Sequence, residues 1–399
     1  MPKTGFINSS GVDVGDLLVP KSYLIDRYPE LVDNFRFAGL WAWGRNDPGQ
    51  LGTNNVTKQS SPVQTVAGGT NWKLVAGGVY HTAAIKTDGT LWTWGRNSLG
   101  QLGTNNITNQ SSPVQTIAGG TNWKTVACGG YHTAAIKTDG TLWTWGNNFF
   151  AQLGTNNITD QSSPVQTVAG GTNWKLVAGG RYHTAAIKTD GTLWTWGVNF
   201  SGQLGNNNAT TRSSPVQTVA SGTNWKSVVC GADHTAAIKT DGTLWLWGRN
   251  SYGQLGTNNI TDQSSPVQTV AGGTNWKLVA GGRYHTVAIK TDGTLWLWGR
   301  NIFGQLGTNN ITDQSSPVQA VAGGTNWKTV ACGGYHTAAI KTDGTLWLWG
   351  RNSYGQLGNN NIAHQSSPVQ TVAGGTNWKL VAGGLYHTAA IRDNSNDYI

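Results

Sequence analysis

The stretch His-Thr-Ala-Ala-Ile-Lys-Thr-Asp-Gly-Thr-Leu-Trp-Thr-Trp-Gly at residues 132–146 decides the fold, because it returns at a fixed interval, in whole or in part, from residue 40 to residue 392 of this 399-residue chain. Three further phrases, Gly-Gln-Leu-Gly, Ser-Ser-Pro-Val-Gln and Thr-Asn-Trp-Lys, return with the same period. The first histidine recurs every 51 residues, seven times, at His81, His132, His183, His234, His285, His336 and His387. A fixed period of this length is typical of a β-propeller or a solenoid.

Each unit contains four short apolar stretches separated by turn residues, and helical periodicity is absent. In the second unit we expect strands over 123–127, 132–137, 142–145 and 164–168. The Asp-Gly pair at 139–140 predicts a hairpin, because glycine readily adopts positive φ. Four strands in each of seven units predict an all-β, seven-bladed β-propeller with four-stranded antiparallel blades.

The repeat is divided between the two ends of the chain. It begins at 40–44 with the last two strands of a unit and stops at 387–392 with the first two. We therefore expect the N- and C-terminal strands to share one blade, which closes the ring and removes open sheet edges. This divides the chain into a propeller at 40–399 and an N-terminal arm at 1–39. The arm either packs on the ring or serves as a docking segment.

Composition and charge limit the classes of function. The chain has 27 basic and 18 acidic residues, a net charge of +9, which favours acidic partners. Its lysines are dispersed over repeated positions, so we do not expect nucleic-acid binding. Cys128, Cys230 and Cys332 occupy one position in alternate units, too far apart for disulfides, and are expected to be free buried thiols. We find neither the apolar segment of a signal peptide nor an apolar run long enough for a membrane span.

The seven histidines raise the question of a metal site. Equivalent positions on adjacent blades are expected about 10 Å apart, the spacing of packed sheets, whereas zinc needs nitrogen ligands at about 2 Å. We therefore expect each histidine to form a structural hydrogen bond to a neighbouring loop. A serine and a histidine repeated in every blade are likewise expected to be structural. The chain is predicted to be no enzyme and to use no metal and no cofactor.

Differences between the seven copies point to one face of the ring. The positions after each Trp-Gly vary, as does the residue two before each histidine, whereas the Asp-Gly turns barely change. In an up-and-down blade both variable loops lie on the same face. Arginine beside aromatic rings suits a protein interface or a sugar-stacking surface, and neutral drift of exposed loops is the alternative. The candidate binding residues on this face are Arg45, Arg96, Phe150, Arg181, Arg249, Tyr252, Arg283, Arg300, Phe303, Arg351 and Tyr354.

The combination of His-Thr-Ala, Asp-Gly-Thr-Leu-Trp-Thr-Trp-Gly, Asn-x-x-Gly-Gln-Leu-Gly and Pro-Val-Gln resembles the regulator-of-chromosome-condensation (RCC1-type) repeat over about nine-tenths of the chain. The resemblance implies a seven-bladed propeller with shared closure. The family's namesake is a guanine-nucleotide exchange factor whose function is associated with a wedge-like insertion. Unbroken histidine spacing leaves no room for a wedge between His81 and His387.

The family also includes the plant ultraviolet-B photoreceptor, whose chromophore tryptophans lie in a Gly-Trp-Arg-His-Thr motif. None of the matching positions here is tryptophan, so we do not expect photoreception. Those positions are Val79, Gly130, Arg181, Ala232, Arg283, Gly334 and Leu385.

Residues 15–21 followed by 39–44 resemble the start of repeat proteins of marine bacteriophage particles, which implies a virion component such as a tail appendage, fibre or surface protein. We therefore predict a non-enzymatic structural or recognition protein. Its arm would meet other virion proteins, and its variable face would meet a host protein or glycan. The expected location is the virion, or otherwise the cytoplasm. The alternatives are a cytosolic interaction scaffold or guanine-nucleotide exchange factor, a lectin-like protein, and a designed or recently duplicated consensus sequence.

Overall fold

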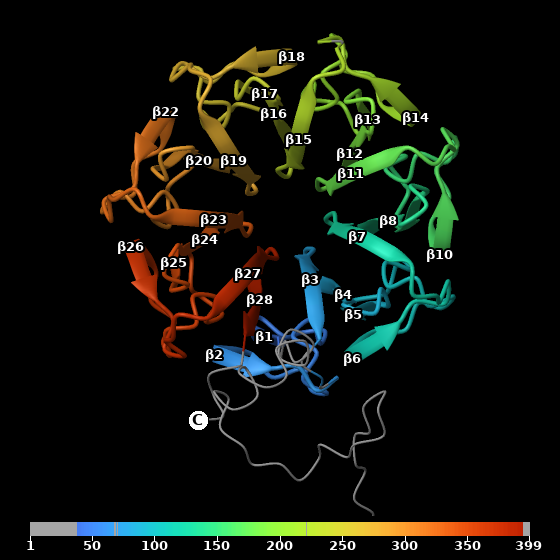
Figure 1. Cartoon of the computed structure of the whole chain (residues 1–399), viewed down its shortest axis with the longest axis horizontal. Helices are drawn as coiled ribbons and strands as arrows, with labels where there is room; N and C mark the ends of the chain where they lie inside the picture. Colours follow the sequence, from blue (N-terminus) through green and yellow to red (C-terminus); the bar gives the residue numbers. More distant parts are fainter. Residues whose placement is uncertain (1–37, 68, 70, 221, 394–399) are drawn as a thin grey trace, which may run out of the picture.

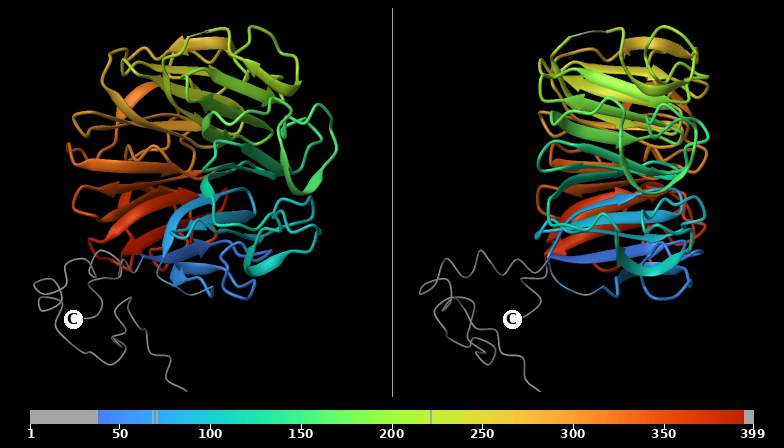
Figure 2. Two further views of the ribbon diagram at one scale, coloured as in Figure 1. Left: turned by 45° about the vertical axis from the view of Figure 1, so that its right-hand side comes forward. Right: turned by 90° about the vertical axis from the view of Figure 1, so that its right-hand side faces the viewer.

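The computed structural model describes residues 38–67, 69, 71–220 and 222–393, and these form 28 β-strands in seven four-stranded antiparallel sheets. The sheets stand around a central axis as the blades of a propeller (Figure 1), and from the side the ring is a single disc (Figure 2). The predicted all-β, seven-bladed fold is confirmed. None of the described residues belongs to a helix long and apolar enough to cross a membrane.

The four strands of a blade follow one another from the axis outward. The strands nearest the axis are β3 (Trp72–Gly77), β7 (Trp123–Cys128), β11 (Trp174–Gly179), β15 (Trp225–Cys230), β19 (Trp276–Gly281), β23 (Trp327–Cys332) and β27 (Trp378–Gly383). The second strands are β4 (His81–Lys86), β8 (His132–Lys137), β12 (His183–Lys188), β16 (His234–Lys239), β20 (His285–Lys290), β24 (His336–Lys341) and β28 (His387–Asp393).

The two outer strands of each blade come from the second half of the repeat. The third strands are β1 (Ala38–Gly44), β5 (Leu91–Gly95), β9 (Leu142–Gly146), β13 (Leu193–Gly197), β17 (Leu244–Gly248), β21 (Leu295–Gly299) and β25 (Leu346–Gly350). The outermost strands are β2 (Gln59–Gln64), β6 (Gln110–Gln115), β10 (Gln161–Gln166), β14 (Arg212–Gln217), β18 (Gln263–Gln268), β22 (Gln314–Gln319) and β26 (Gln365–Gln370).

One blade is built from both ends of the chain, as predicted. Its strand order is β2-β1-β28-β27, and β1 pairs with β28 from Ala38↔Asp393 to Gly44↔His387. The strand β1 begins at Ala38, two residues before the expected start of the repeat at Leu40. Residues 1–37 lie outside the described part of the chain, so the predicted docking role of the arm stays a prediction.

The outermost strand of the second unit differs from its prediction. It runs over Gln161–Gln166 rather than 164–168. Its pairing with β9 starts at Gln161↔Gly146 and shifts register before Val165↔Thr144. The polar Gln-Ser-Ser start and this irregular register conceal the beginning of the strand in the sequence, and the strand ends before the loop toward the next blade.

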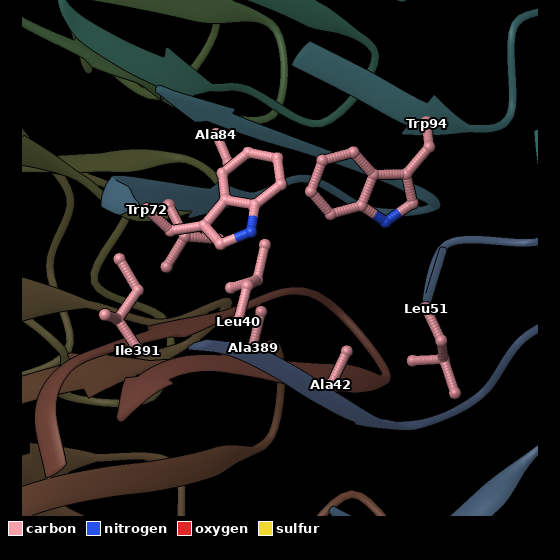
Figure 3. Close-up of a cluster of buried hydrophobic side chains, with 9 residues drawn as sticks. Leu40, Ala42, Leu51, Trp72, Ala84, Trp94, Ala389 and Ile391 are labelled. Atoms are coloured by element: carbon pink, nitrogen blue, oxygen red, sulfur yellow. The ribbon is translucent and has the colours of Figure 1, made fainter. Parts of the chain in front are cut away.

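The hydrophobic core lies between blades rather than inside them. At the closing blade, Leu40 and Ala389 pack with Trp72 and Trp94 of the next blade (Figure 3). The two indole rings meet edge to face, with centroids 6.2 Å apart, a geometry that the ring quadrupoles favour. Because each blade buries its apolar residues against a neighbour, the core is complete only when the ring closes.

The periodic histidines link each blade to the next. His81 Nε2 lies 3.0 Å from Thr133 Oγ1, and that hydroxyl donates to the carbonyl oxygen of Gln101 at 2.9 Å. Since the threonine proton is used there, Nε2 must carry the imidazole hydrogen and donate it. Trp145 Nε1 donates to the same carbonyl at 3.0 Å. The histidine–threonine contact is present at all seven positions.

The expectation of a direct hydrogen bond from each histidine to a neighbouring loop therefore needs correction, because the loop is reached through a threonine. Burial lowers the pKa of His81 to about 4 and that of His132 to about 3, so these imidazoles are neutral at pH 7. Among the residues the structure describes, no three His, Cys, Asp or Glu side chains are grouped to hold a metal ion.

Candidate functional site

A buried asparagine fixes each long loop between the third and fourth strands. In the loop after β9, Asn148 Oδ1 accepts from the backbone N of Leu153, and Nδ2 donates to Thr155 Oγ1 at 3.1 Å and to the carbonyl of Asn157 at 3.0 Å. The side chain is fully buried. Similar bonds are made by the equivalents Asn46, Asn97, Asn199, Asn250, Asn301 and Asn352. The residues next to this asparagine are therefore displayed on a rigid loop.

All eleven predicted binding residues lie at the same end of the ring and touch aromatic rings there. Antiparallel pairing brings the end of each innermost strand and the loop after each third strand to one face. The guanidinium of Arg300 lies 4.4 Å from the ring centroid of Tyr252, and that of Arg351 lies 5.1 Å from Phe303. Phe150 packs against Tyr182 at 4.7 Å. The remaining predicted residues make comparable contacts.

The common partner of these side chains is a set of tyrosines that the sequence reasoning missed. Each directly precedes a periodic histidine, and each is at least partly buried. The sequence signal is Tyr-His-Thr in six of the seven repeats, but variation between copies does not single out a residue that is nearly constant. We call the eleven predicted residues and these tyrosines the arginine–aromatic face. The added tyrosines are Tyr80, Tyr131, Tyr182, Tyr284, Tyr335 and Tyr386.

The seventh position of this set is an aspartate. Asp233 Oδ2 lies 3.7 Å from Arg249. Burial raises the pKa of Asp233, and attraction to Arg181, Arg249 and Arg283 opposes that rise. The tyrosine ring is therefore interrupted once, by a carboxylate surrounded by arginines.

A cavity of about 370 Å³ lies on the ring axis beneath the arginine–aromatic face. It is lined by the Gly-Gly loops, the three cysteines, Arg181 and Arg283. Backbone N–H groups of this lining bond either within their own blade, as Gly129 N does to the carbonyl of His132, or to the next blade, as Val79 N does to the carbonyl of Gly130, so they offer no anion cradle. The cysteines are free, as predicted, but they are half-buried rather than buried because they line this cavity. Desolvation raises the pKa of the Cys128 thiol to about 12. A thiol that stays protonated is a poor nucleophile.

The opposite face, which we call the constant face, carries the Asp-Gly turns. Here Lys137 Nζ lies 4.9 Å from the ring centroid of Trp123 and 4.6 Å from that of Trp143. The same arrangement recurs at Lys86, Lys188, Lys239, Lys290 and Lys341. In the turn itself, Asp139 Oδ1 accepts from the backbone N and hydroxyl of Thr141, and these bonds lower the pKa of Asp139. The lysine and the aspartate of each Asp-Gly turn are thus engaged locally.

Comparison with known sequences and structures agrees with this architecture. A model of the RCC1-like domain matches residues 168–399, and RCC1 repeat models match residues 39–85, 88–136 and 139–187. The chain is 36% identical over 324 residues to the ultraviolet-B receptor UVR8 of Arabidopsis thaliana, covering 79% of this chain and 74% of the receptor. It is 29% identical over 366 residues to the RCC1 domain-containing protein RUG3, mitochondrial, of the same plant, covering 83% and 82%.

Solved structures share the fold at lower identity. Human WBSCR16 superimposes with a TM-score of 0.80 at 22% identity, covering 90% of this chain and 99% of that one. Prp20p of Saccharomyces cerevisiae superimposes with a TM-score of 0.79 at 18% identity, covering 91% and 93%. From its repeats, its closed ring and these matches, the chain belongs to the RCC1 repeat family.

Proposed function

We propose that this chain is a non-enzymatic recognition propeller that binds another macromolecule through the arginine–aromatic face. The observation that carries the proposal is the gathering of all eleven variable arginine and aromatic residues into contacts at one end of the ring. The constant histidine, threonine and buried tryptophan positions are already engaged between blades. We therefore expect the positions that differ between copies, on the arginine–aromatic face, to contact the partner.

The contacts of this face suit an acidic macromolecule. Seven arginines stand on it, each partly buried against an aromatic ring. Stacking holds a guanidinium flat and reduces the rotamer freedom that binding must remove. Cation–π pairs and aromatic rings are also enriched in protein interfaces. The face thus combines positive charge with preorganised ring surfaces.

We do not propose that this chain senses light, although one relative is named as an ultraviolet-B receptor. The reason is that other residues occupy the positions that would carry the chromophore tryptophans. Two of them, Arg181 and Arg283, stack on Tyr182 and Tyr284 in the arginine–aromatic face, and the others are small or aliphatic. We therefore assign these positions to binding rather than to light absorption.

The proposal is tested with three forms of the full chain and two probes, a displayed library of random dodecapeptides and a glycan array. The forms are wild type, the triple variant Tyr252→Ala/Phe303→Ala/Tyr354→Ala, and a constant-face control, Lys124→Gln/Lys175→Gln/Lys226→Gln. We expect ligands selected on wild type to bind the control equally and to lose most of their affinity for the triple variant. Equal binding to all three forms would overturn the proposal.

We further propose that the propeller is a component of a phage particle. This rests on the similarity of residues 15–21 and 39–44 to repeat proteins of marine phage particles, and residues 15–21 lie outside the described part of the chain. Mass spectrometry of purified particles should detect the chain in a fixed stoichiometry. Absence from the particles, together with acceleration of nucleotide exchange on a small GTPase, would instead support the exchange-factor alternative.

A further inference from the structure

One part of the arginine–aromatic face differs from the rest by exposing phenylalanine. Phe149 and Phe200 are 66% and 71% exposed, and they are the only exposed aromatic side chains among the described residues. Phe150 joins them, with its ring centroid 4.9 Å from that of Phe149 and 6.2 Å from that of Phe200. On its inner side Phe150 packs on Tyr182, which stacks on Tyr131 at 5.6 Å. We call these five residues the phenylalanine sector.

The two loops that carry the exposed phenylalanines are also the two that lack arginine. In five of the seven loops after Trp-Gly the next residue is arginine, whereas here it is Asn147 or Val198. Val198 is buried. The loss of the cation and the gain of an exposed ring thus occur together in two neighbouring blades, so the sector is apolar where the rest of the face is cationic.

The loop that carries Phe149 has side-chain hydrogen bonds of its own. Gln152 Nε2 donates to Asn147 Oδ1 at 2.6 Å, and Asn147 Nδ2 donates to Asp160 Oδ1 at 3.1 Å. The matching Nε2 atoms of Gln254 and Gln305 are buried without a hydrogen-bond partner in the structure. These extra bonds preorganise the loop, which lowers the entropy that a partner must remove on binding.

The same loop holds a strained backbone position. Ala151 adopts φ 63°, whereas the matching positions in the other six loops are glycine. A left-handed residue with a β-carbon costs about 1–2 kcal/mol, and such strain persists only where the surroundings hold it. The bonds of this loop therefore hold Ala151 in a conformation that its β-carbon disfavours.

The polar side chains beside the phenylalanine sector favour a protein partner over a glycan. A sugar that stacks on an aromatic ring also needs amide or carboxylate groups at its hydroxyls, and here Asn147, Gln152 and Asp160 are bonded to one another. The backbone N of Asn148 also donates to Asp160 Oδ1 at 2.6 Å. The rings are thus offered without the polar companions that a sugar requires, while exposed aromatic anchors are typical of protein interfaces.

We infer, on the basis of the proposed function, that Phe149 and Phe200 anchor a protein segment with an apolar side chain flanked by acidic residues. The apolar side chain packs on the phenylalanine sector. The acidic residues face the nearby arginines, beginning with Arg181, which lies in the same blade as Phe200 and stacks on Tyr182 of the sector. Charge complementarity between these arginines and the acidic flanks positions the segment over the sector.

The test uses the dodecapeptide library selected on the full wild-type chain, with individual peptides measured against three variants. Phe149→Ser/Phe200→Ser removes the anchor. Ile260→Ser/Ile311→Ser is the matched control, because these side chains are 65% and 64% exposed and lie on other loops. The triple variant described above tests the rest of the face. We expect selected peptides to share an apolar residue flanked by Asp or Glu, and to lose about tenfold or more in affinity on the anchor variant, as truncated hot spots do.

Each other outcome counts against a defined part of the account. Peptides that bind the anchor variant and the control equally but fail on the triple variant would refute the anchor and leave the proposed function standing. Peptides that bind all forms equally, or no selected peptides at all, would overturn both for protein partners. Glycans that require Phe149 and Phe200, without peptide binding, would overturn the choice of a protein segment.

Discussion

The two faces of this ring are made by the same 51-residue repeat, yet they differ in how far the copies agree. On the constant face, the lysine before each Asp-Gly turn lies near two tryptophan rings, as Lys86 and Lys341 do, and each turn aspartate bonds the threonine of its own turn. On the arginine–aromatic face, the buried asparagine is constant but the residues beside it change. Side chains that bond to the neighbouring blade or to their own turn have the same surroundings in each copy, and they are therefore constant. The exposed loop positions lack such shared surroundings, and they vary between copies.

Acid should have the largest effect on the shared architecture, because all seven histidines act together. Their folded pKa values are lowered by burial to about 3 or 4, against 6.5 in the unfolded chain. Above pH 6.5 the histidines are neutral in both the folded and the unfolded chain, and they do not lower the unfolding free energy. Below this pH the unfolded state binds protons that the folded state cannot, so the unfolding free energy falls by about 1.4 kcal/mol per pH unit for each histidine, or about 10 kcal/mol per pH unit for seven.

Urea unfolding at several values between pH 7 and pH 5, followed by tryptophan fluorescence, checks this dependence. The variant His132→Gln should reduce the slope by one seventh in addition to lowering the overall stability. A flat profile over this range would mean that the histidines are not buried and neutral.

Removal of one buried tryptophan between blades should have the next largest effect. Trp145 is fully buried and donates to the carbonyl of Gln101, so Trp145→Ala should lower the unfolding free energy by about 3–5 kcal/mol. The matched variant Trp143→Ala removes a half-buried ring on the constant face and should cost less than half as much. Equal losses in denaturant unfolding would place the core inside the blades instead of between them.

Two glycine-to-alanine variants test whether the periodic histidines pack tightly beneath the arginine–aromatic face. A β-carbon at Gly129 would lie 2.1 Å from His132 Cε1, whereas at Gly170 it would meet nothing within 4 Å at φ +51°. Gly129→Ala should therefore cost about 3 kcal/mol through overpacking, and Gly170→Ala about 1 kcal/mol through its left-handed backbone. Thermal unfolding of the two variants separates the cases. The reverse order would contradict the position given to the histidine.

The smallest change in stability is expected at the exposed rings. Phe200→Ser alters a side chain that is 71% exposed and should shift the unfolding free energy by no more than about 0.5 kcal/mol. The same variant should weaken the selected peptides about tenfold. A large loss of stability would assign Phe200 to packing and would remove the reason to treat its loop as a binding element.

The sequence predicted those features that depend on local order and on counting. The period, the four strands of a unit and the divided repeat at the chain ends led to the propeller and its closing blade, and variation between copies located eleven residues on one face. Contacts between blades were beyond reach, because His81 and Thr133 are joined by packing that no local pattern encodes. The tyrosines were overlooked because they are constant, and the start of β10 because its first residues are polar. Whether the face binds a partner stays a prediction.

Hydrogen–deuterium exchange of the full chain with and without a selected peptide tests the central claim most directly. The account predicts slowed exchange in the loops over 147–153 and 198–203 and in the nearby segments 128–131 and 179–182, with the Asp-Gly turns unchanged. Protection confined to the Asp-Gly turns of the constant face would contradict it.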